Sequence, residues 1–487
     1  FMSKANSHVR KIIDWKVILG IQVIASLALI GIIFKLGALP MQYALIIIAI
    51  VVLLCVGTFF LMKPSKKKGT GKVRNIIGKL VSILLSVALL FGTLSIAQGT
   101  SVLDAITGAN VQTQRYSVVV LKDSSYKTLS DLKGETIETV SSVDEENAKK
   151  AIEAMQKEES SLETKDVDSY LKAANDLYDS ETKAILVNES YYAIIEADHE
   201  DFQNDVREIW SFDIEEEIKD ISKNVNVTKE PFIVYISGID TSGPVSTVSR
   251  SDVNMLVTVN PKTRQILLTS IPRDYYVTLA NRGQKDKLTH SGLAGIDNTV
   301  KTMENFLGLD INYYARVNFT SLIQMVDALG GITINNDVAF TGYNGTYFAK
   351  GNISINGDEA LEYSRERHAF GAGDNERVFH QQIVIMGMLN KMMSPAVITN
   401  YSSVLNAIEG CFETNMSSSE ITSLIQMQIN DMASWNMVQK QFSGHGVMQT
   451  GGAYMPSSRL YYMIPDNESV SENVAAIKSV LNGETVE

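Results

Sequence analysis

Three long apolar segments near the N-terminus restrict what this chain can fold into. They cover residues 17–34, 41–62 and 80–97, and each approaches or reaches the ~20 residues with which a helix crosses a lipid bilayer. The first and third segments are at the short end, where a signal peptide or a buried helix is the alternative. Three such segments so close together favour a membrane anchor of three transmembrane helices.

The charges around these segments predict their orientation. Residues 1–16 and the loop 63–79 are rich in lysine and arginine, whereas the link after the first segment carries only Lys35. Because basic residues concentrate on the cytoplasmic side of membrane proteins, the N-terminal tail and the loop are expected to be cytoplasmic. Everything after about Gln98 is then extracellular, which predicts a multi-pass protein of the cell membrane with its catalytic part outside.

The part after the anchor divides by composition into two regions. Residues 99–111 are expected to be a linker, and residues 112–226 a small accessory α/β domain in which strands alternate with helices. The formal net charge of the chain is −12, and acidic residues are frequent from Asp144 to Asp220. Such a surface argues against nucleic acid as a partner. We find no catalytic pattern in this region and predict a spacer or partner-binding role. Residues 227–487 form the second domain.

The first charged motifs of the second domain accompany three apolar, β-branched runs at 232–240, 250–260 and 265–270, which we interpret as strands. Charged residues stand at the ends of these strands: Asp240, Arg250, Asp252, Arg273 and Asp274. Carboxylate oxygens bind Mg²⁺ and guanidinium groups bind phosphate oxygens, so this set suits a metal-bridged polyphosphate. Solvated charges at strand ends are the alternative interpretation.

A second group of charged residues lies farther along the chain. Arg365 and Arg367 are two apart, and a helix predicted to begin at Asp374 carries Arg377 and Gln381 on the same face. A polar, arginine-bearing start on an otherwise apolar helix is what an anion site beside an apolar cavity requires. For the methionine-rich remainder of this helix we prefer core packing over a lipid tunnel, although both have the same composition.

Taken in order, these motifs resemble the LytR–CpsA–Psr family of cell-envelope proteins over roughly residues 231–393. The matching pieces are Gly238-Ile239-Asp240, Arg250-Ser251-Asp252, Ser270-Ile271-Pro272-Arg273-Asp274, Val326-Asp327-Ala328-Leu329-Gly330-Gly331-Ile332, Arg365-Glu366-Arg367 and Gly373-Asp374-Asn375-Glu376-Arg377 with Gln381. The three apolar segments and the extra domain before the match are similar to the capsule-associated CpsA branch.

The resemblance implies an α/β domain with a central mixed sheet flanked by helices, and a hydrophobic pocket that holds a polyprenyl chain with its pyrophosphate at the mouth. In that site Asp240 and Asp252 would bind Mg²⁺, with Mn²⁺ as the alternative. The pyrophosphate would be bound by Arg250, Arg273, Arg365, Arg367, Arg377 and Gln381. Catalytic roles fall to Arg250, Arg273, Asp274 and Asp374, and either aspartate would orient arginines or act as the base.

The implied activity is that of a magnesium-dependent phosphotransferase or ligase-type transferase. It moves capsular polysaccharide, or a related cell-wall glycopolymer, from polyprenyl pyrophosphate onto peptidoglycan. In this scheme a sugar hydroxyl attacks the anomeric carbon and polyprenyl pyrophosphate leaves. The expected partners are the lipid-linked glycan, peptidoglycan, the membrane and other capsule-assembly proteins, with no nucleic acid.

Three alternative functions stay open at this point. A hydrolase would use the same site with water as the acceptor, and a carrier would bind the lipid-linked glycan without catalysis. A transcription regulator would need a cytoplasmic DNA-binding fold, for which the predicted cytoplasmic tail and loop are too short.

Overall fold

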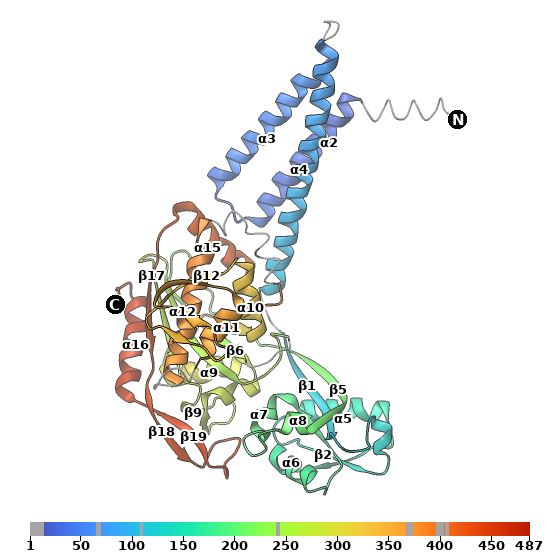
Figure 1. Cartoon of the computed structure of the whole chain (residues 1–487), viewed down its shortest axis with the longest axis vertical. Helices are drawn as coiled ribbons and strands as arrows, with labels where there is room; N and C mark the ends of the chain where they lie inside the picture. The colour runs from blue at the N-terminus through green and yellow to red at the C-terminus, as the bar shows by residue number, and fades with distance from the viewer. Residues whose placement is uncertain are drawn as a thin grey trace, which may run out of the picture.

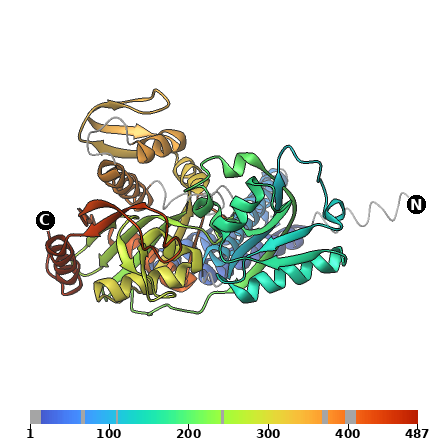
Figure 2. The same cartoon turned by 90° about the horizontal axis from the view of Figure 1, so that it is seen from below.

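The computed structural model describes residues 14–64, 70–107, 111–239, 244–366, 374–395, 404 and 409–487. Three long helices form a rod that projects from two α/β units (Figure 1). The two units lie side by side, as the view from below also shows (Figure 2). The predicted architecture, an α/β protein with three apolar N-terminal helices, is confirmed.

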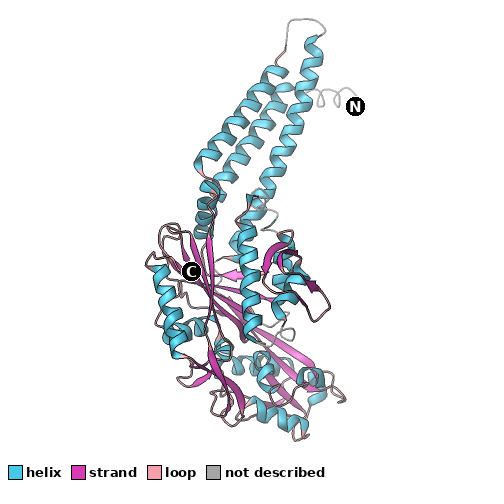
Figure 3. Ribbon diagram, turned by 60° about the vertical axis from the view of Figure 1, so that its left-hand side comes forward, coloured by secondary structure: helices cyan, strands magenta, loops and turns pink. Residues whose placement is uncertain are grey.

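The rod consists of α2 (Trp15–Leu36), α3 (Met41–Met62) and α4 (Thr70–Ile106), which run alongside one another (Figure 3). All three are long and apolar enough to cross a membrane. Gln22 of α2 connects them, because its Oε1 atom accepts hydrogen bonds from the hydroxyls of Thr58 on α3 (2.8 Å) and Ser82 on α4 (2.6 Å). Such bonds satisfy polar groups where lipid offers no water.

The end of α4 differs from the prediction. Residues 99–106, expected to be a linker, continue the helix without interruption. Val102, Leu103 and Ile106 are buried in a core cluster that also contains Val326 and Tyr363 of the second α/β unit. Because these apolar side chains recur at helical spacing and bury against that unit, packing favours helix over linker. The last apolar helix therefore ends inside the core of the second unit.

The first α/β unit contains a five-stranded sheet in the order β3-β2-β4-β1-β5. Its strands are β1 (Val111–Leu121), β2 (Thr136–Thr139), β3 (Glu163–Asp166), β4 (Ala184–Asn188) and β5 (Val206–Glu217). Its helical elements are η1 (Leu129–Leu132), α5 (Glu145–Glu158), α6 (Tyr170–Tyr178), η2 (Glu189–Tyr191), α7 (Tyr192–Ile195) and α8 (Phe202–Asp205). The expected alternation is present. We did not predict β5, in which Ile214 is the single buried residue.

The second unit is built on a six-stranded mixed sheet in the order β16-β11-β6-β7-β8-β17. Its strands are β6 (Phe232–Ile239), β7 (Ser251–Asn260), β8 (Gln265–Ile271), β11 (Tyr313–Asn318), β16 (Phe412–Thr414) and β17 (Asn436–Gln441). The three apolar runs predicted as strands form β6, β7 and β8, which pair antiparallel. β11 joins β6, and β17 joins β8, in parallel.

Helices cover both faces of this sheet. They are η3 (Leu288–Ala294), α9 (Ile296–Leu307), α10 (Phe319–Ala328), α11 (Gly357–Arg365), α12 (Asp374–Met392), α15 (Ser418–Asp431) and α16 (Asn467–Leu481). Leu256 and Leu267 pack in one core cluster with residues of α9 and α16, whereas Met255 and Leu268 pack in another with residues of α12. This alternation follows from the two-residue period of a strand. The apolar residues of α12 belong to core clusters, which confirms the preference for core packing.

Short two-stranded sheets complete the second unit. They are formed by β9 (Tyr276–Thr278) with β10 (Lys285–Lys287), β12 (Ile332–Asn336) with β15 (Gly351–Ile355), β13 (Phe340–Thr341) with β14 (Tyr347–Phe348), and β18 (Gly444–Gln449) with β19 (Leu460–Pro465).

Backbone hydrogen bonds join the two α/β units. The amide of Thr113 in β1 donates to the carbonyl of Ser246 (2.9 Å), and the amide of Val248 donates to the carbonyl of Thr113 (2.8 Å). The Ser190 hydroxyl also donates to the carbonyl of Val248 (2.7 Å). These bonds hold the segment that leads into β7 and ends at Arg250. The first unit therefore helps to position a predicted site residue of the second.

Candidate functional site

Four predicted site residues meet at one end of the central sheet. Arg250 precedes β7, Asp252 is the second residue of that strand, and Arg273 and Asp274 follow β8. Because β7 and β8 run antiparallel, the start of one lies beside the end of the other. Asp252 connects both arginines: its Oδ1 atom lies 3.1 Å from Nη1 of Arg273, and its Oδ2 atom 3.5 Å from Nη2 of Arg250.

Asp252 is buried, and its carboxylate is held by several donors. In addition to the two arginines, the hydroxyl of Thr289 donates to Oδ1 (2.9 Å). A buried carboxylate is tolerated when charged groups and hydrogen bonds surround it, and Asp252 meets this condition. The side chains of Arg250 and Arg273 are 27% and 24% exposed, so both reach solvent while the buried Asp252 holds them in place.

Lys287 is a further member of this group that sequence reasoning missed. Its Nζ atom lies 3.0 Å from Oδ1 of Asp274, and Asp274 also lies 3.7 Å from Nε of Arg273 through its other oxygen. We call Arg250, Asp252, Arg273, Asp274 and Lys287 the arginine–aspartate cluster. It contains three cations and two carboxylates, so its net charge is positive and suits an anionic ligand.

The element η3 supports the backbone on both sides of the cluster. The amide of Thr289 donates to the carbonyl of Arg273 (2.9 Å). Gly292 lies against the segment before β7, where a Cβ atom would come within 2.5 Å of the carbonyl oxygen of Ser249 and 2.8 Å of the amide nitrogen of Ser251. Only glycine allows this approach. The positions of Arg250 and Arg273 therefore depend on the same short helical element.

The remaining arginines lie on α11 and α12. Arg365 ends α11 and is exposed, whereas Arg377 is buried near the start of α12, and Gln381 follows one turn later, half-buried. The Nε2 atom of Gln382 donates to the hydroxyl of Ser270 (2.9 Å) and so fixes α12 near the end of β8, from which Arg273 follows. The helix begins at Asp374, as predicted, and the Asp374 side chain lies outside the described residues.

Two further predicted residues, Asp240 and Arg367, also lie outside the described residues. Across the described ranges, no three His, Cys, Asp or Glu side chains come together as a metal site. The donor chemistry at Asp252 nevertheless fits a hard cation, because the contact of its Oδ2 atom is long and carboxylate oxygens are the ligands that Mg²⁺ prefers.

A cavity of about 260 Å³ adjoins the cluster. Its walls come from both α/β units, and they include Ala193, Glu196 and Ala197 from the first and Arg250, Lys287 and His290 from the second. Sequence reasoning predicted no chemistry for the first unit and did not single out His290. Helical spacing could not have found the pair, because Asp286 lies on β10 and His290 on η3.

His290 and Asp286 form a buried pair on the wall of this cavity. Nδ1 of His290 lies 2.9 Å from Oδ1 of Asp286. Burial by itself raises the pKa of Asp286, but the hydrogen bonds from His290 and from the amides of Tyr454 and Lys287 outweigh it, so the pKa is lowered below its usual value. Asp286 is therefore an ionised carboxylate that holds the imidazole in place.

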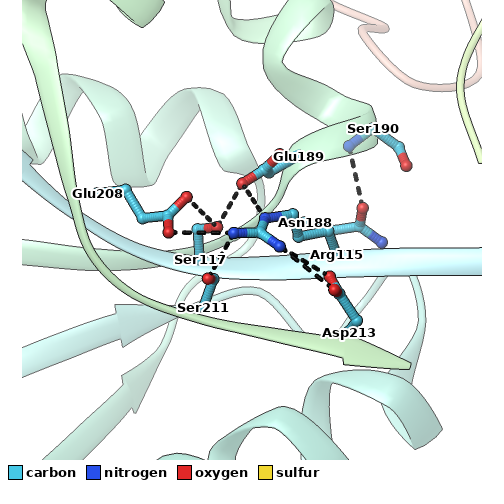
Figure 4. A network of polar contacts seen from close by, with 8 residues as sticks. All are labelled: Arg115, Ser117, Asn188, Glu189, Ser190, Glu208, Ser211 and Asp213. Carbon is cyan, nitrogen blue, oxygen red and sulfur yellow. Dashed lines mark hydrogen bonds and ion pairs between the residues drawn. The ribbon is translucent and has the colours of Figure 1, made fainter. Parts of the chain in front are cut away.

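Another arginine with acidic partners lies in the first unit, on β1 (Figure 4). Arg115 contacts Glu189 (3.2 Å), Glu208 (3.2 Å) and Asp213 (3.1 Å), and it donates to the hydroxyl of Ser211 (2.6 Å). We call these residues the Arg115 network. Its carboxylates outnumber its single cation, so the network has no excess positive charge with which to bind an anion.

Comparison with known proteins identifies the second unit. The model of the LytR_cpsA_psr family matches residues 197–475. TagU of Bacillus licheniformis, named as a polyisoprenyl-teichoic acid–peptidoglycan teichoic acid transferase, is 34% identical over 277 residues, which are 54% of this chain and 86% of TagU. TagU of Enterococcus faecalis is 36% identical over 248 residues, which are 50% of this chain and 80% of that protein.

A solved structure and a second family model also match. The crystal structure of TagU from B. subtilis has 33% sequence identity and a TM-score of 0.42, and the match covers 53% of this chain and 100% of that one. The model of a DNA polymerase processivity factor matches residues 67–187, which join the apolar α4 to most of the first unit, and it covers too little of the chain to show a family. The first family model, in contrast, spans more than half of the sequence, and the chain belongs to the LytR_cpsA_psr family.

Proposed function

We propose that this protein is a membrane-anchored transferase that moves a glycopolymer from a polyprenyl pyrophosphate carrier onto peptidoglycan. The observation that carries the proposal is the arginine–aspartate cluster, in which two partly exposed guanidinium groups are held by one buried carboxylate. Membership of a family whose relatives are named as teichoic acid transferases supports the reaction class.

In this proposal Arg250 and Arg273 bind the pyrophosphate of the donor. Guanidinium groups held in fixed orientations stabilise the negative charge that develops on phosphate oxygens during transfer. Asp274 and Lys287 hold Arg273 from the other side. Arg365, Arg367, Arg377 and Gln381 remain proposed pyrophosphate ligands on α11, on α12 and in the segment between them.

Asp252 and Asp240 are the residues that would hold Mg²⁺. The metal would neutralise charge on the pyrophosphate and so make the lipid phosphate a better leaving group. Asp252 would bind the ion through the oxygen that has only the long contact to Arg250. Whether the cation is required is tested by chelation and by replacement with Mn²⁺.

We write the reaction as a phosphotransfer. The acceptor oxygen bonds to the phosphorus that carries the glycan, the bond from that phosphorus to the lipid phosphate breaks, and polyprenyl phosphate leaves. Attack at the anomeric carbon would instead release polyprenyl pyrophosphate. The two lipid products differ by one phosphate, so their identification decides which bond is broken.

The test uses the full chain in lipid nanodiscs with Mg²⁺, a polyprenyl-pyrophosphoryl oligosaccharide and a peptidoglycan fragment. Released lipid and glycan-modified peptidoglycan are measured together, for the wild type and for Arg273→Ala and Arg115→Ala. We expect modified peptidoglycan with the wild type and Arg115→Ala, and none with Arg273→Ala. Lipid release without modified peptidoglycan would indicate a hydrolase, and donor binding without either product would indicate a carrier.

Two finer features of the proposal need their own tests. Capsular polysaccharide is proposed as the glycopolymer from the similarity to the capsule-associated branch, whereas the relatives' names state teichoic acid. Parallel assays with both lipid-linked donors compare them directly. The extracellular position of the second unit is proposed from the basic residues around the spans, and a topology reporter fused after Glu487 that reads cytoplasmic would refute it.

A further inference from the structure

We propose that the cavity between the two α/β units is the subsite for the acceptor sugar, and that His290 takes the proton from the acceptor hydroxyl there. This inference rests on the transferase function proposed above and adds to it the place of the second substrate and the identity of the base. It also gives the first α/β unit a role, because that unit supplies one wall of the cavity.

The position of the cavity fits an acceptor that must reach the donor phosphate. Arg250 and Lys287 belong to the arginine–aspartate cluster and also line the cavity. A ligand in the cavity would therefore lie next to an anion bound at the cluster. The volume of about 260 Å³ is just below the ~300–1,000 Å³ of pockets for drug-sized ligands, so it suits a single sugar ring.

The contacts that attach the first unit to the second lie close in sequence to residues that line this cavity. The backbone bonds of Thr113 and the Ser190 hydroxyl bond hold the segment before Arg250. Ser190 also lies in η2, directly before α7, and α7 forms part of the cavity wall. The same contacts thus set the position of the cavity wall and of Arg250. This is expected of a site that binds a donor at the arginine–aspartate cluster and an acceptor in the cavity.

His290 has the geometry of a general base. Asp286 receives the Nδ1 hydrogen, which fixes the ring orientation and leaves Nε2 as the atom with the lone pair. Within the described residues Nε2 makes no hydrogen bond, and the ring lines the cavity. Asp274, in contrast, is engaged by Arg273 and Lys287 and serves to orient those cations.

The charged and titratable groups around His290 come from four parts of the chain. Asp286 and Lys287 belong to β10, Arg250 precedes β7, and Glu196 follows α7. The Tyr454 ring packs edge-on, with its centroid 6.0 Å from that of His290. Asp286 is the carboxylate that contacts the ring nitrogen of His290, so it is the positioning residue that stabilises the imidazolium formed in the reaction.

The proposed step balances without any further reactant. The acceptor oxygen forms its bond to the donor phosphorus, and the bond from that phosphorus to the lipid phosphate oxygen breaks with its electron pair. The hydroxyl proton passes to Nε2 of His290. Polyprenyl phosphate leaves as the anion, and the imidazolium later returns its proton to water.

The first test is His290→Asn, which retains a donor toward Asp286 but has no atom in the place of Nε2. We expect transfer to fall ~10²–10⁴-fold, with donor binding unchanged. The pH profile of the transfer rate should differ between the wild type and the variant. The matched control is His445→Asn, because His445 is exposed on β18.

Asp286→Asn tests the positioning role. Loss of the carboxylate removes the stabilisation of the imidazolium, so the pH profile of the transfer rate should shift relative to that of the wild type. A residue that acts only through folding would lower the rate without shifting this profile.

A cavity-filling substitution tests the subsite and leaves His290 and Asp286 unchanged. Ala197 lines the cavity and is exposed, so Ala197→Phe should fold while filling part of the space. We expect the KM for the peptidoglycan fragment to rise at least several-fold and donor binding to stay unchanged. Ala349→Phe, at an exposed alanine of the second unit outside the cavity lining, is the control.

The outcomes separate this inference from the proposed function. A wild-type chain that transfers nothing overturns both. Normal transfer and pH dependence in His290→Asn overturns the base, as does a parallel loss of donor binding, which would place His290 in donor binding or folding. An unchanged acceptor KM in Ala197→Phe overturns the subsite. If His290→Asn does not fold, the pH profile of Asp286→Asn still tests the base, and the kinetics of Ala197→Phe still test the subsite.

Discussion

The arginine–aspartate cluster and the Arg115 network use the same residue types in different proportions. In the Arg115 network one arginine contacts three carboxylates. In the cluster, two arginines share Asp252, and Lys287 adds a third cation against only two carboxylates. The sequence alone does not distinguish the two arrangements, because each consists of charged residues on or near strands.

The difference shows how a structural ion network is distinguished from an anion site. Arg115 is 37% exposed and its acidic partners neutralise it in excess, so an added anion would meet repulsion. At the cluster the surplus is positive, and the shared carboxylate is buried at 7% exposure beneath guanidinium groups that reach solvent. An incoming phosphate would there complete the charge balance.

The largest expected effect is that of Arg273→Ala. Removal of a group that stabilises developing charge costs ~10²–10³-fold in rate, so we expect transfer to fall by about this factor. Arg115→Ala should keep wild-type transfer. The measurement is the initial rate of peptidoglycan modification in nanodiscs. Equal losses in the two variants would contradict the functional distinction between the two regions.

The next effect concerns the shared carboxylate. Asp252→Asn preserves the shape but replaces a carboxylate oxygen with a donor that faces guanidinium groups. We expect a ~10–100-fold loss of activity and a higher Mg²⁺ requirement, as is typical when a metal-binding site is perturbed. Asp213→Asn in the Arg115 network is the matched control. Mg²⁺ titrations of the rate that coincide for wild type and Asp252→Asn would refute the proposed metal ligand.

A smaller effect is expected for the stability of the first unit. Arg115→Ala removes three partly exposed ion pairs and leaves their carboxylates uncompensated. Exposed pairs contribute little, so the free energy of unfolding should fall by no more than about 1 kcal/mol. Denaturant titration followed by tryptophan fluorescence, to which Trp210 on β5 contributes, measures this change. A loss of several kcal/mol would show that the network is a major stabilising element.

The smallest effect is that of Glu189→Gln. Burial raises the pKa of Glu189 above its usual value, although bonds from Ser117 and Arg115 oppose the shift. The pKa of Glu189 is higher in the folded state than in the unfolded state. Its contribution to the free energy of unfolding is therefore present at low pH and is lost as pH rises through the folded-state pKa. Glu189→Gln should remove this decline and raise stability near pH 7 by a few tenths of a kcal/mol. Denaturant titrations at pH 4.5 and about pH 7 measure the decline, and an unchanged decline in the variant would contradict it.

Sequence reasoning found the elements that have strong periodic or compositional signals. The three apolar helices, the strands β6 to β8, and the start of α12 at Asp374 all follow from runs of apolar residues and their breaks. It missed β5, which has one buried residue, and the continuation of α4 through 99–106. In both cases the packing partners are distant in sequence: β5 pairs with β1, and the end of α4 packs against the second unit.

The candidate site divides in the same way. The charged residues that precede β7 or follow β8 were found because Arg250, Asp252, Arg273 and Asp274 stand at the ends of recognisable strands. Lys287, Thr289 and His290 were missed, since their places depend on the β9–β10 pairing and on how closely η3 approaches Ser249. The cavity requires two units of the chain to meet, and no local pattern describes that contact.

The sequence by itself therefore determined the apolar segments that can span a membrane, the central strands, and the residue types available for an anion site. These depend on composition and on periods of two or 3.6 residues, which are local properties. Tertiary structure alone decided which charges share Asp252, that cations exceed carboxylates there, and that His290 lies on an interdomain cavity beside them. Ion pairing and cavity formation act over a few ångströms in space, between residues that the chain brings together only when it folds.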